Sequence, residues 1–160
     1  MSQEVLNRPI IIADRSPQNT STGSLMTYVP AAIAIFGSLA LVLLRINAGG
    51  ERFISDGALM MLALASYLIA AVFHLTNMYA PFRFAEKLGM WAATLGVLFN
   101  LSSWLVRWVA AYDRELAIFN SQGANPADMP WVFRYVPFAN LYDLSLAFAF
   151  GAGITTLLVI

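Results

Sequence analysis

The sequence predicts an all-α, polytopic integral membrane protein with about four transmembrane helices. Of its 160 residues, 59% are apolar and only 11% are charged, whereas a typical soluble domain has about 45–50% apolar and about 25% charged residues. Long uncharged apolar runs recur along the chain, each close to the roughly 20 residues that cross a bilayer as a helix. No stretch alternates apolar and polar residues with a period of two, which argues against a membrane β-barrel.

The charge balance and the cysteine content exclude several classes of function. Nine basic residues balance nine acidic ones, so there is no basic excess to neutralise the phosphates of a nucleic acid. Because the chain has no cysteine, it forms no disulfide framework, no thiolate metal site and no thiol nucleophile. No Ser–His–Asp, paired-carboxylate, P-loop, HExxH or GxGxxG arrangement is present. The residues themselves therefore assign neither a catalytic group nor a metal site.

A polar N-terminal tail, residues 1–24, precedes the predicted transmembrane domain, residues 25–160. The first long apolar run starts only at Leu25 and has no small-residue cleavage site, so we interpret it as a retained helix rather than a signal peptide. We expect four spans, at about 25–45, 57–79, 88–107 and 140–160. A long loop over 108–139 connects the last two.

The first two spans are uncharged, and the second contains His74. A neutral imidazole could ligate haem iron or a metal, or transfer a proton. However, a single histidine near the end of a span is more often a hydrogen-bonded residue at the membrane interface, because a metal site needs further ligands. The chain has no second histidine. Both interpretations of His74 stay open at this point.

The third span carries a polar stripe. Gly96, Asn100, Ser103 and Arg107 are spaced by three or four residues, so they share one face of a helix. Small residues at this spacing let two helices approach closely, and an asparagine can form a hydrogen bond across the contact. A helix–helix seam is therefore the favoured interpretation. The alternative is a polar track that leads to Arg107 at the water boundary.

The expected long loop is rich in aromatic and charged residues, and long loops often carry function. Its Trp and Tyr side chains would equally suit a lipid–water interface, and residues 110–120 could form a short helix along the surface. The fourth span opens with Asn140 three residues before Asp143, the spacing of a helix N-cap with an acidic partner. Basic residues divide four against five between the two sides of the membrane, so charge does not predict the orientation.

A motif lies between the last two predicted spans. The residues that carry it are Arg107, Trp108, Pro137, Asn140, Leu141, Tyr142 and Asp143. One order of features is typical of the CcsA/ResC-type cytochrome c assembly proteins (system II cytochrome c biogenesis). In these proteins a span ends in Arg-Trp, a loop follows, and a Pro-x-Ser-Asn-Leu/Met-Tyr-Glu motif precedes the next span. Residues 87–160 resemble that family. Ala139 and Asp143 replace the family's Ser and Glu, and the loop is longer than usual.

The resemblance implies an integral protein of the bacterial inner membrane or of the thylakoid membrane. Its complex would deliver haem across the membrane and attach it to apocytochrome c. The implied partners are apocytochrome c, a CcsB/ResB-type membrane protein and the lipid bilayer, with no nucleic acid. Haem is the implied cofactor, and the candidate residues for binding it are Arg107, Trp108, Arg134 and His74, with arginine matching its carboxylates.

The family's Trp-rich haem-binding segment with flanking histidines is absent from this sequence. We therefore expect an N-terminal part of a longer protein, which is not catalytic by itself although the family acts as a cytochrome c synthase. The alternative is a structural or scaffold membrane subunit whose polar seams only pack helices. A small transporter or quinone-binding subunit ranks below both, because it would need an acid or a base near mid-membrane and the spans have none.

Overall fold

The computed structural model describes residues 26–123, 125–138 and 140–159, and all regular structure in these residues is helical. Four helices are long and apolar enough to cross a membrane: α2 (Val29–Asn47), α3 (Asp56–Tyr79), α4 (Arg83–Ser121) and α5 (Leu141–Val159). Short 3-10 turns lie in the connections: η1 (Gly50–Arg52), η2 (Pro126–Asp128) and η3 (Val132–Tyr135). The predicted all-α polytopic membrane fold is confirmed, and the predicted tail over 1–24 lies outside the described residues.

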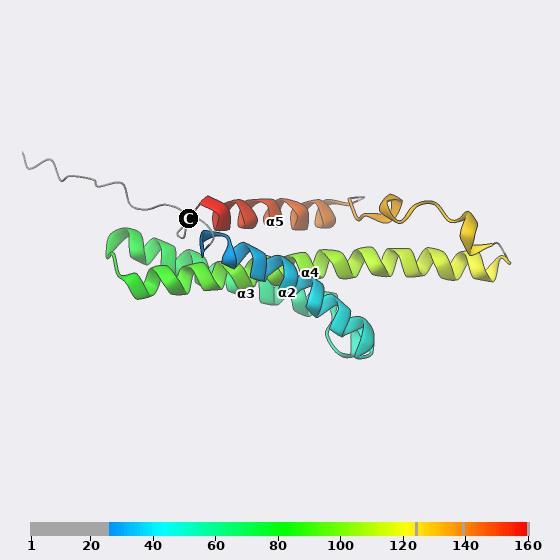
Figure 1. Cartoon of the computed structure of the whole chain (residues 1–160), viewed down its shortest axis with the longest axis horizontal. Helices are drawn as coiled ribbons and strands as arrows, with labels where there is room; N and C mark the ends of the chain where they lie inside the picture. The colour runs from blue at the N-terminus through cyan, green and yellow to red at the C-terminus, as the bar shows by residue number, and fades with distance from the viewer. Residues whose placement is uncertain (1–25, 124, 139, 160) are drawn as a thin grey trace, which may run out of the picture.

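Helix α4 is the centre of the bundle (Figure 1). Helices α2, α3 and α5 all pack on α4, and α3 does so most extensively. Both α3 and α5 run antiparallel to α4, and α2 crosses it at an angle. The starts of α3 and α5 therefore lie at the same end of the bundle, beside the middle of α4.

The outer surface of the bundle is apolar. Phe36 on α2, Leu68 on α3 and Phe148 on α5 are 70%, 59% and 71% exposed, and many other large hydrophobic side chains also point outward. Soluble proteins rarely expose apolar surface on this scale. Lipid is therefore the solvent for these faces, and the chain is an integral membrane protein.

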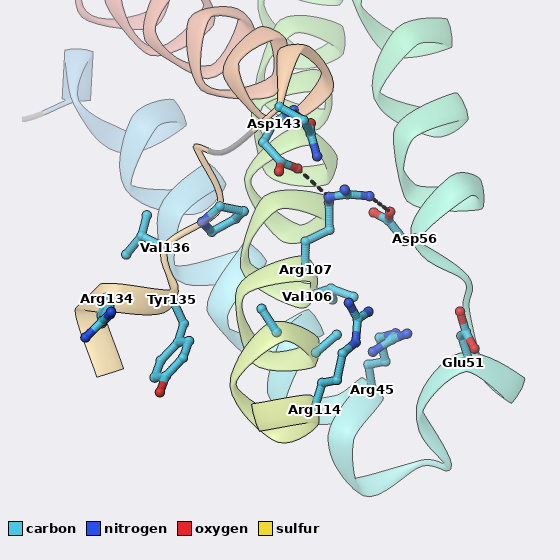
Figure 2. A pocket seen from close by; sticks show the side chains of 14 residues that line it. Arg45, Glu51, Asp56, Val106, Arg107, Arg114, Arg134, Tyr135, Val136 and Asp143 are labelled. Atoms are coloured by element: carbon cyan, nitrogen blue, oxygen red, sulfur yellow. Dashed lines mark hydrogen bonds and ion pairs between the residues drawn. The ribbon is translucent and has the colours of Figure 1, made fainter. Parts of the chain in front are cut away.

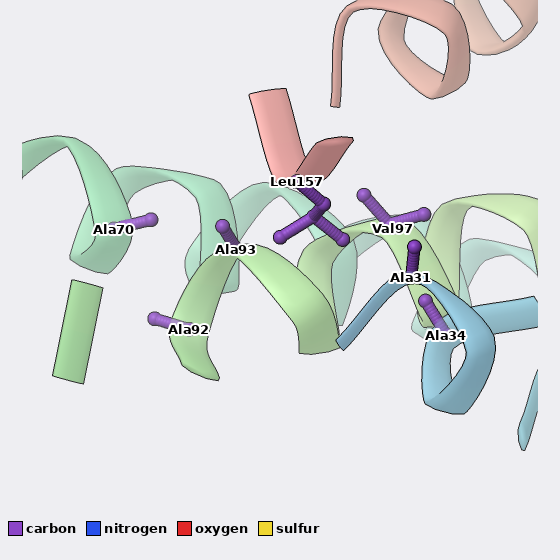
Figure 3. Packing of buried hydrophobic residues seen from close by; sticks show 7 residues of the cluster. All are labelled: Ala31, Ala34, Ala70, Ala92, Ala93, Val97 and Leu157. Atoms are coloured by element: carbon purple, nitrogen blue, oxygen red, sulfur yellow. The ribbon is translucent and has the colours of Figure 1, made fainter. Parts of the chain in front are cut away.

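Small residues form the core where the four helices meet (Figure 3). The buried cluster consists of Ala31, Ala34, Ala70, Ala92, Ala93, Val97 and Leu157. Helices in lipid associate through close packing and hydrogen bonds rather than through the hydrophobic effect, and alanine lets their backbones approach. Two glycines allow a further approach: a Cβ at Gly96 would lie 2.6 Å from the ring of Tyr67, and one at Gly153 would lie 2.6 Å from its hydroxyl oxygen.

Helix α4 is longer than the predicted third span. The sequence predicts a span over 88–107, a loop from 108 and a separate helix over 110–120. This prediction is wrong, because one helix continues from Arg83 to Ser121. No proline interrupts it, and residues 108–121 include several strong helix formers. It stops before Gly123, which has a φ of 67°, the left-handed conformation that commonly ends helices. The other helices begin and end within about four residues of the predicted spans.

The length of α4 means that part of it lies outside the membrane. At 1.5 Å per residue, its 39 residues measure about 58 Å, whereas the hydrocarbon core of a bilayer is about 30 Å thick. Figure 1 shows the far end of α4 extending beyond α2 and α3, with the chain then running back beside it to α5. We call residues 131–138 of this connection the return segment.

Aromatic side chains hold the return segment against α4. Trp104, Trp108 and Tyr112 are four residues apart and therefore share one face of the helix. The indole N–H groups of Trp104 and Trp108 donate to backbone carbonyl oxygens of the return segment at 3.1 and 3.0 Å. The ring pairs, with centroids 5.3 to 5.8 Å apart, are Trp104 with Phe138, Trp108 with Phe133, and Tyr112 with Tyr135. These aromatic residues pack within the protein, in addition to any contact with the lipid interface.

Candidate functional site

A charged cluster connects three helices at the end of the bundle where α3 and α5 begin. Arg107 Nε donates to Asp143 Oδ1 at 2.6 Å, and Arg107 Nη1 donates to Asp56 Oδ2 at 3.0 Å. Asp56 and Asp143 lie in the first turns of α3 and α5. One guanidinium on α4 therefore holds both helix starts, as Figure 2 shows. We call these three residues the Arg107 cluster.

Neighbouring groups complete the Arg107 cluster. Ser103 donates its hydroxyl hydrogen to Asp56 Oδ1, and the ring of Tyr142 lies 4.4 Å from the guanidinium carbon of Arg107. The cluster has two carboxylates for one cation, and the positive ends of the α3 and α5 dipoles stabilise the additional negative charge. The side chain of Asp143 is only 5% exposed. Its charge depends on Arg107, because a buried carboxylate without a partner is strongly destabilising.

The predicted polar stripe of α4 is a helix–helix seam. Asn100 Nδ2 donates to the backbone oxygen of Leu146 on α5 at 3.2 Å and to the hydroxyl oxygen of Tyr67 on α3 at 3.5 Å. Gly96 lies against Tyr67, and Ser103 binds Asp56. The same stripe also leads to Arg107, so the seam and the polar track predicted as alternatives are formed by the same residues.

The predicted N-cap of α5 is confirmed. Asn140 Oδ1 accepts the backbone N–H of Asp143 at 2.8 Å. The Asp143 carboxylate, however, does not complete a capping box and instead binds Arg107. Helix α3 begins in the same way, because Ser55 Oγ accepts the N–H of Ala58 at 3.1 Å. Both carboxylates of the cluster are therefore fixed by helix starts with polar caps.

A cavity of about 490 Å³ lies beside the Arg107 cluster (Figure 2). The end of α2, the turn η1, the middle of α4, the return segment and the start of α5 all contribute to its lining. Its charged residues are Arg45, Glu51, Asp56, Arg107, Arg114, Arg134 and Asp143. The two arginines predicted to bind haem carboxylates, Arg107 and Arg134, thus line one cavity.

The third candidate, Trp108, lies on the other side of α4. Residues 106, 110 and 114 line the cavity, whereas 105, 109 and 112 line an almost wholly apolar groove between α2 and α4, and Trp108 belongs to this groove. Successive residues of an α-helix turn by about 100°, so these two sets occupy opposite faces. Helix α4 itself separates Trp108 from the charged cavity.

The fourth candidate, His74, lies far from the cavity. It is eighteen residues after Asp56 on α3, which corresponds to about 27 Å along the helix. Its ring packs on α4 at Gly89, where a Cβ would lie 3.1 Å from Nε2. This Nε2 atom is buried and has no hydrogen-bond partner among the described residues. The imidazole lies in a helix seam, and it does not share a site with Arg107 or Arg134.

Sequence reasoning missed Asp56 and Tyr67. A signal for Asp56 exists: successive spans alternate in direction, so residue 56, at the end of the first connection, lies on the same side of the membrane as Arg107. The sequence gives no comparable signal for Tyr67, because an aromatic residue inside an apolar span resembles any other core residue. The sequence identifies Arg45 and Arg114 only as basic residues near the ends of predicted spans.

No family model, no curated protein and no solved structure matches this chain. The site is therefore interpreted from its own residues. Within the described ranges, no group of three or more His, Asp and Glu residues is arranged to hold a metal ion. What the site offers is the recognition of negatively charged oxygens by guanidinium groups.

Proposed function

We propose that the chain is a membrane component of cytochrome c biogenesis that helps to deliver haem to apocytochrome c and to attach it there. The observation that carries this proposal is the Arg107–Asp143 ion pair, which joins residues 36 positions apart in the chain. These residues belong to the two halves of the family-like motif, the Arg-Trp end of one span and the Asn-Leu-Tyr-Asp start of the next. The ion pair explains why the motif combines an arginine at the end of one span with an acidic residue at the start of the next.

Haem would be held through its carboxylates. Arg134 lines the cavity and makes no ion pair within the described residues, and an arginine fork matches a carboxylate. Arg107 is engaged by two aspartates, so it shapes the site more than it offers free donors. No His or Met stands among the described residues that line the cavity, so this lining fits the carboxylates of haem and supplies neither a histidine nor a methionine for its iron.

The proposed reaction needs groups from other proteins. Haem attachment to a c-type cytochrome uses thiols, and this chain has none, so the thiols belong to apocytochrome c. We place the protein in a bacterial inner membrane or a thylakoid membrane, in a complex with a CcsB/ResB-type partner. Within that complex the cavity would face the side of the membrane on which the apocytochrome is modified.

The test measures haem co-purification and holocytochrome c yield together. The protein is expressed with its partner and a reporter apocytochrome, as wild type, as Arg134→Gln and as the control Arg83→Gln. Arg83 is exposed at the first position of α4, at the opposite end of the bundle. We expect about a tenfold loss of bound haem in Arg134→Gln, the effect of one charge-assisted hydrogen bond, and no loss in the control. Unchanged haem and holocytochrome in Arg134→Gln would exclude the carboxylate role.

A structural subunit is the second candidate. It is favoured by the Arg107 cluster itself, in which both carboxylates and the guanidinium satisfy one another. A purely structural role predicts that Arg134→Gln leaves holocytochrome yield unchanged, whereas Gly96→Leu, which drives a side chain into Tyr67, abolishes assembly with partner proteins. Normal holocytochrome production in cells that lack the protein would reject the biogenesis proposal as a whole.

A further inference from the structure

Three arginines line the cavity without taking part in the Arg107 cluster. Arg45 lies in the last turn of α2, Arg114 lies on the projecting part of α4, and Arg134 lies in η3 of the return segment. None of them makes an ion pair within the ranges that the structure describes. Three separate elements thus bring these cations to one cavity.

The donors of these arginines are available to a ligand. Arg45 uses its Nε to donate to the backbone oxygen of Ile54 at 2.8 Å. This bond fixes the side chain and leaves the terminal nitrogens of the fork free. Arg114 and Arg134 are exposed. Each guanidinium can therefore direct two parallel N–H groups at an oxyanion.

The charge balance of the cavity favours an anion. Asp56 and Asp143 both bind Arg107, so Glu51 is the one remaining carboxylate among the lining residues that the structure describes, against three cations. Like charges that share a small space repel one another. An oxyanion bound between them would remove this repulsion, which is the usual origin of anion affinity in arginine clusters.

The position of the cavity places it at the membrane surface. Helices α3 and α5 begin at the Arg107 cluster, so this level marks the boundary of the hydrocarbon core. Arg114 lies seven residues further along α4, about 10 Å beyond that level. The headgroup layer on each side of a bilayer is about 5–8 Å deep, so the cavity spans the depth at which lipid phosphates lie.

We propose that Arg45, Arg114 and Arg134 form a binding site for a phosphate-type oxyanion. The same chemistry has two possible sources, the headgroup of an anionic phospholipid and a free phosphate compound, and the experiment below separates them. The site goes beyond haem handling, because it adds Arg45 and Arg114 to the ligand-binding residues and does not depend on which reaction the complex performs.

The experiment uses the full chain in lipid nanodiscs. In the first arm, phosphatidylcholine discs contain a minor fraction of phosphatidylglycerol, and native mass spectrometry measures how much phosphatidylglycerol the released protein retains. In the second arm, inorganic pyrophosphate is titrated into discs of phosphatidylcholine alone. The cavity variant is Arg114→Gln with Arg134→Gln. The control is Arg52→Gln with Arg83→Gln, which removes the same charge from two exposed positions outside the cavity lining.

We expect the cavity variant to lose about a hundredfold in affinity for the bound probe, about tenfold for each arginine, and the control to match the wild type. Loss of phosphatidylglycerol retention identifies a lipid headgroup as the source, and loss of pyrophosphate binding identifies a free phosphate compound. Equal binding by the wild type and the cavity variant in both arms, or no binding by the wild type in either arm, would overturn the proposal. The single variant Arg134→Lys, which keeps the charge and the fold but lacks the fork, should bind with intermediate affinity.

Discussion

The two parts of α4, before and after Arg107, hold their neighbours by different means. Before Arg107 the helix is buried at twelve positions, and most of these are Ala, Gly, Ser or other small residues. After Arg107 none of its residues is fully buried. The aromatic rings of Trp108 and Tyr112, together with Trp104 one turn before Arg107, hold the return segment. In lipid, burying apolar surface gives no energetic advantage, and the association of helices depends on close packing. In water, large apolar rings drive association. The change of packing mode along one helix thus marks where its solvent changes.

Removal of Arg107 should have the largest effect, because this residue stands where the two parts of α4 join. Arg107→Ala leaves the buried carboxylate of Asp143 without its cation, and breaking such a pair costs about 3–5 kcal/mol. The measurement is thermal unfolding in nanodiscs. Asp143→Asn combined with Arg107→Ala removes the unpaired charge and should recover part of the loss. A double variant no more stable than Arg107→Ala would show that the unpaired carboxylate is not the cause.

Filling a glycine site should disrupt the membrane part of α4 specifically. Gly96→Leu places carbon atoms where the ring of Tyr67 lies, and overpacking of this kind typically costs about 1–3 kcal/mol. Gly151→Leu is the matched control, because a Cβ at Gly151 meets nothing within 4 Å. Thermal unfolding should show a lower midpoint for Gly96→Leu alone. Equal midpoints for the two variants would mean that the contact with Tyr67 does not limit packing.

Loss of one aromatic ring should release the part of α4 beyond Arg107 and leave the membrane part intact. Trp108→Ala removes both the ring contact with Phe133 and the hydrogen bond to the return segment. We expect faster hydrogen exchange over residues 131–138 and unchanged exchange in α3, because local opening follows local contacts. Trp91→Ala, at a lipid-facing position that is 44% exposed, serves as the control. Faster exchange in α3 as well would show that the two parts are not separable.

The smallest expected effect concerns the helix cap at the start of α5. Asn140→Ala removes the acceptor for the N–H of Asp143, and such a loss costs about 1 kcal/mol. Asn120→Ala, near the end of α4, changes the same residue type at an exposed position. A shift of the unfolding midpoint should occur only in Asn140→Ala. Identical midpoints would show that the Asp143 carboxylate is positioned without its cap.

The sequence predicts the spans and the cap of α5 because both depend on local patterns. In lipid, an uncharged run of about 20 residues can satisfy its backbone N–H and C=O groups by forming a helix. Asn140 three residues before Asp143 is a local capping signal. The extension of α4 escaped the same reasoning. Arg107 ends the apolar run, yet a charged residue ends only the membrane part of a helix, and this helix continues to Ser121, shortly before Gly123.

The candidate site was predicted in part. Arg107 and Arg134 do line one cavity, whereas Trp108 and His74 lie on other faces of the bundle. Their separation depends on the rotation of α4 and on which helices pack together, and neither is encoded in local spacing. The partner of Arg107 on α3, Asp56, is 51 residues away in the chain, and only the alternating direction of the spans hints at it. The spacing of Trp104, Trp108 and Tyr112 by four residues is typical of a common helix face, and the predicted loop over 108–139 did not take this signal into account.

The great length of α4 has a mechanical consequence. A stiff rod that is gripped over one part and free over the other acts as a lever, so a slight tilt of the gripped part becomes a larger displacement of the tip. Arg134 belongs to η3 of the return segment, which Trp108 and Tyr112 hold against the projecting part of α4, whereas Arg45 belongs to α2. A tilt of α4 would therefore move Arg114 and Arg134 together relative to Arg45 and change the width of the cavity between them.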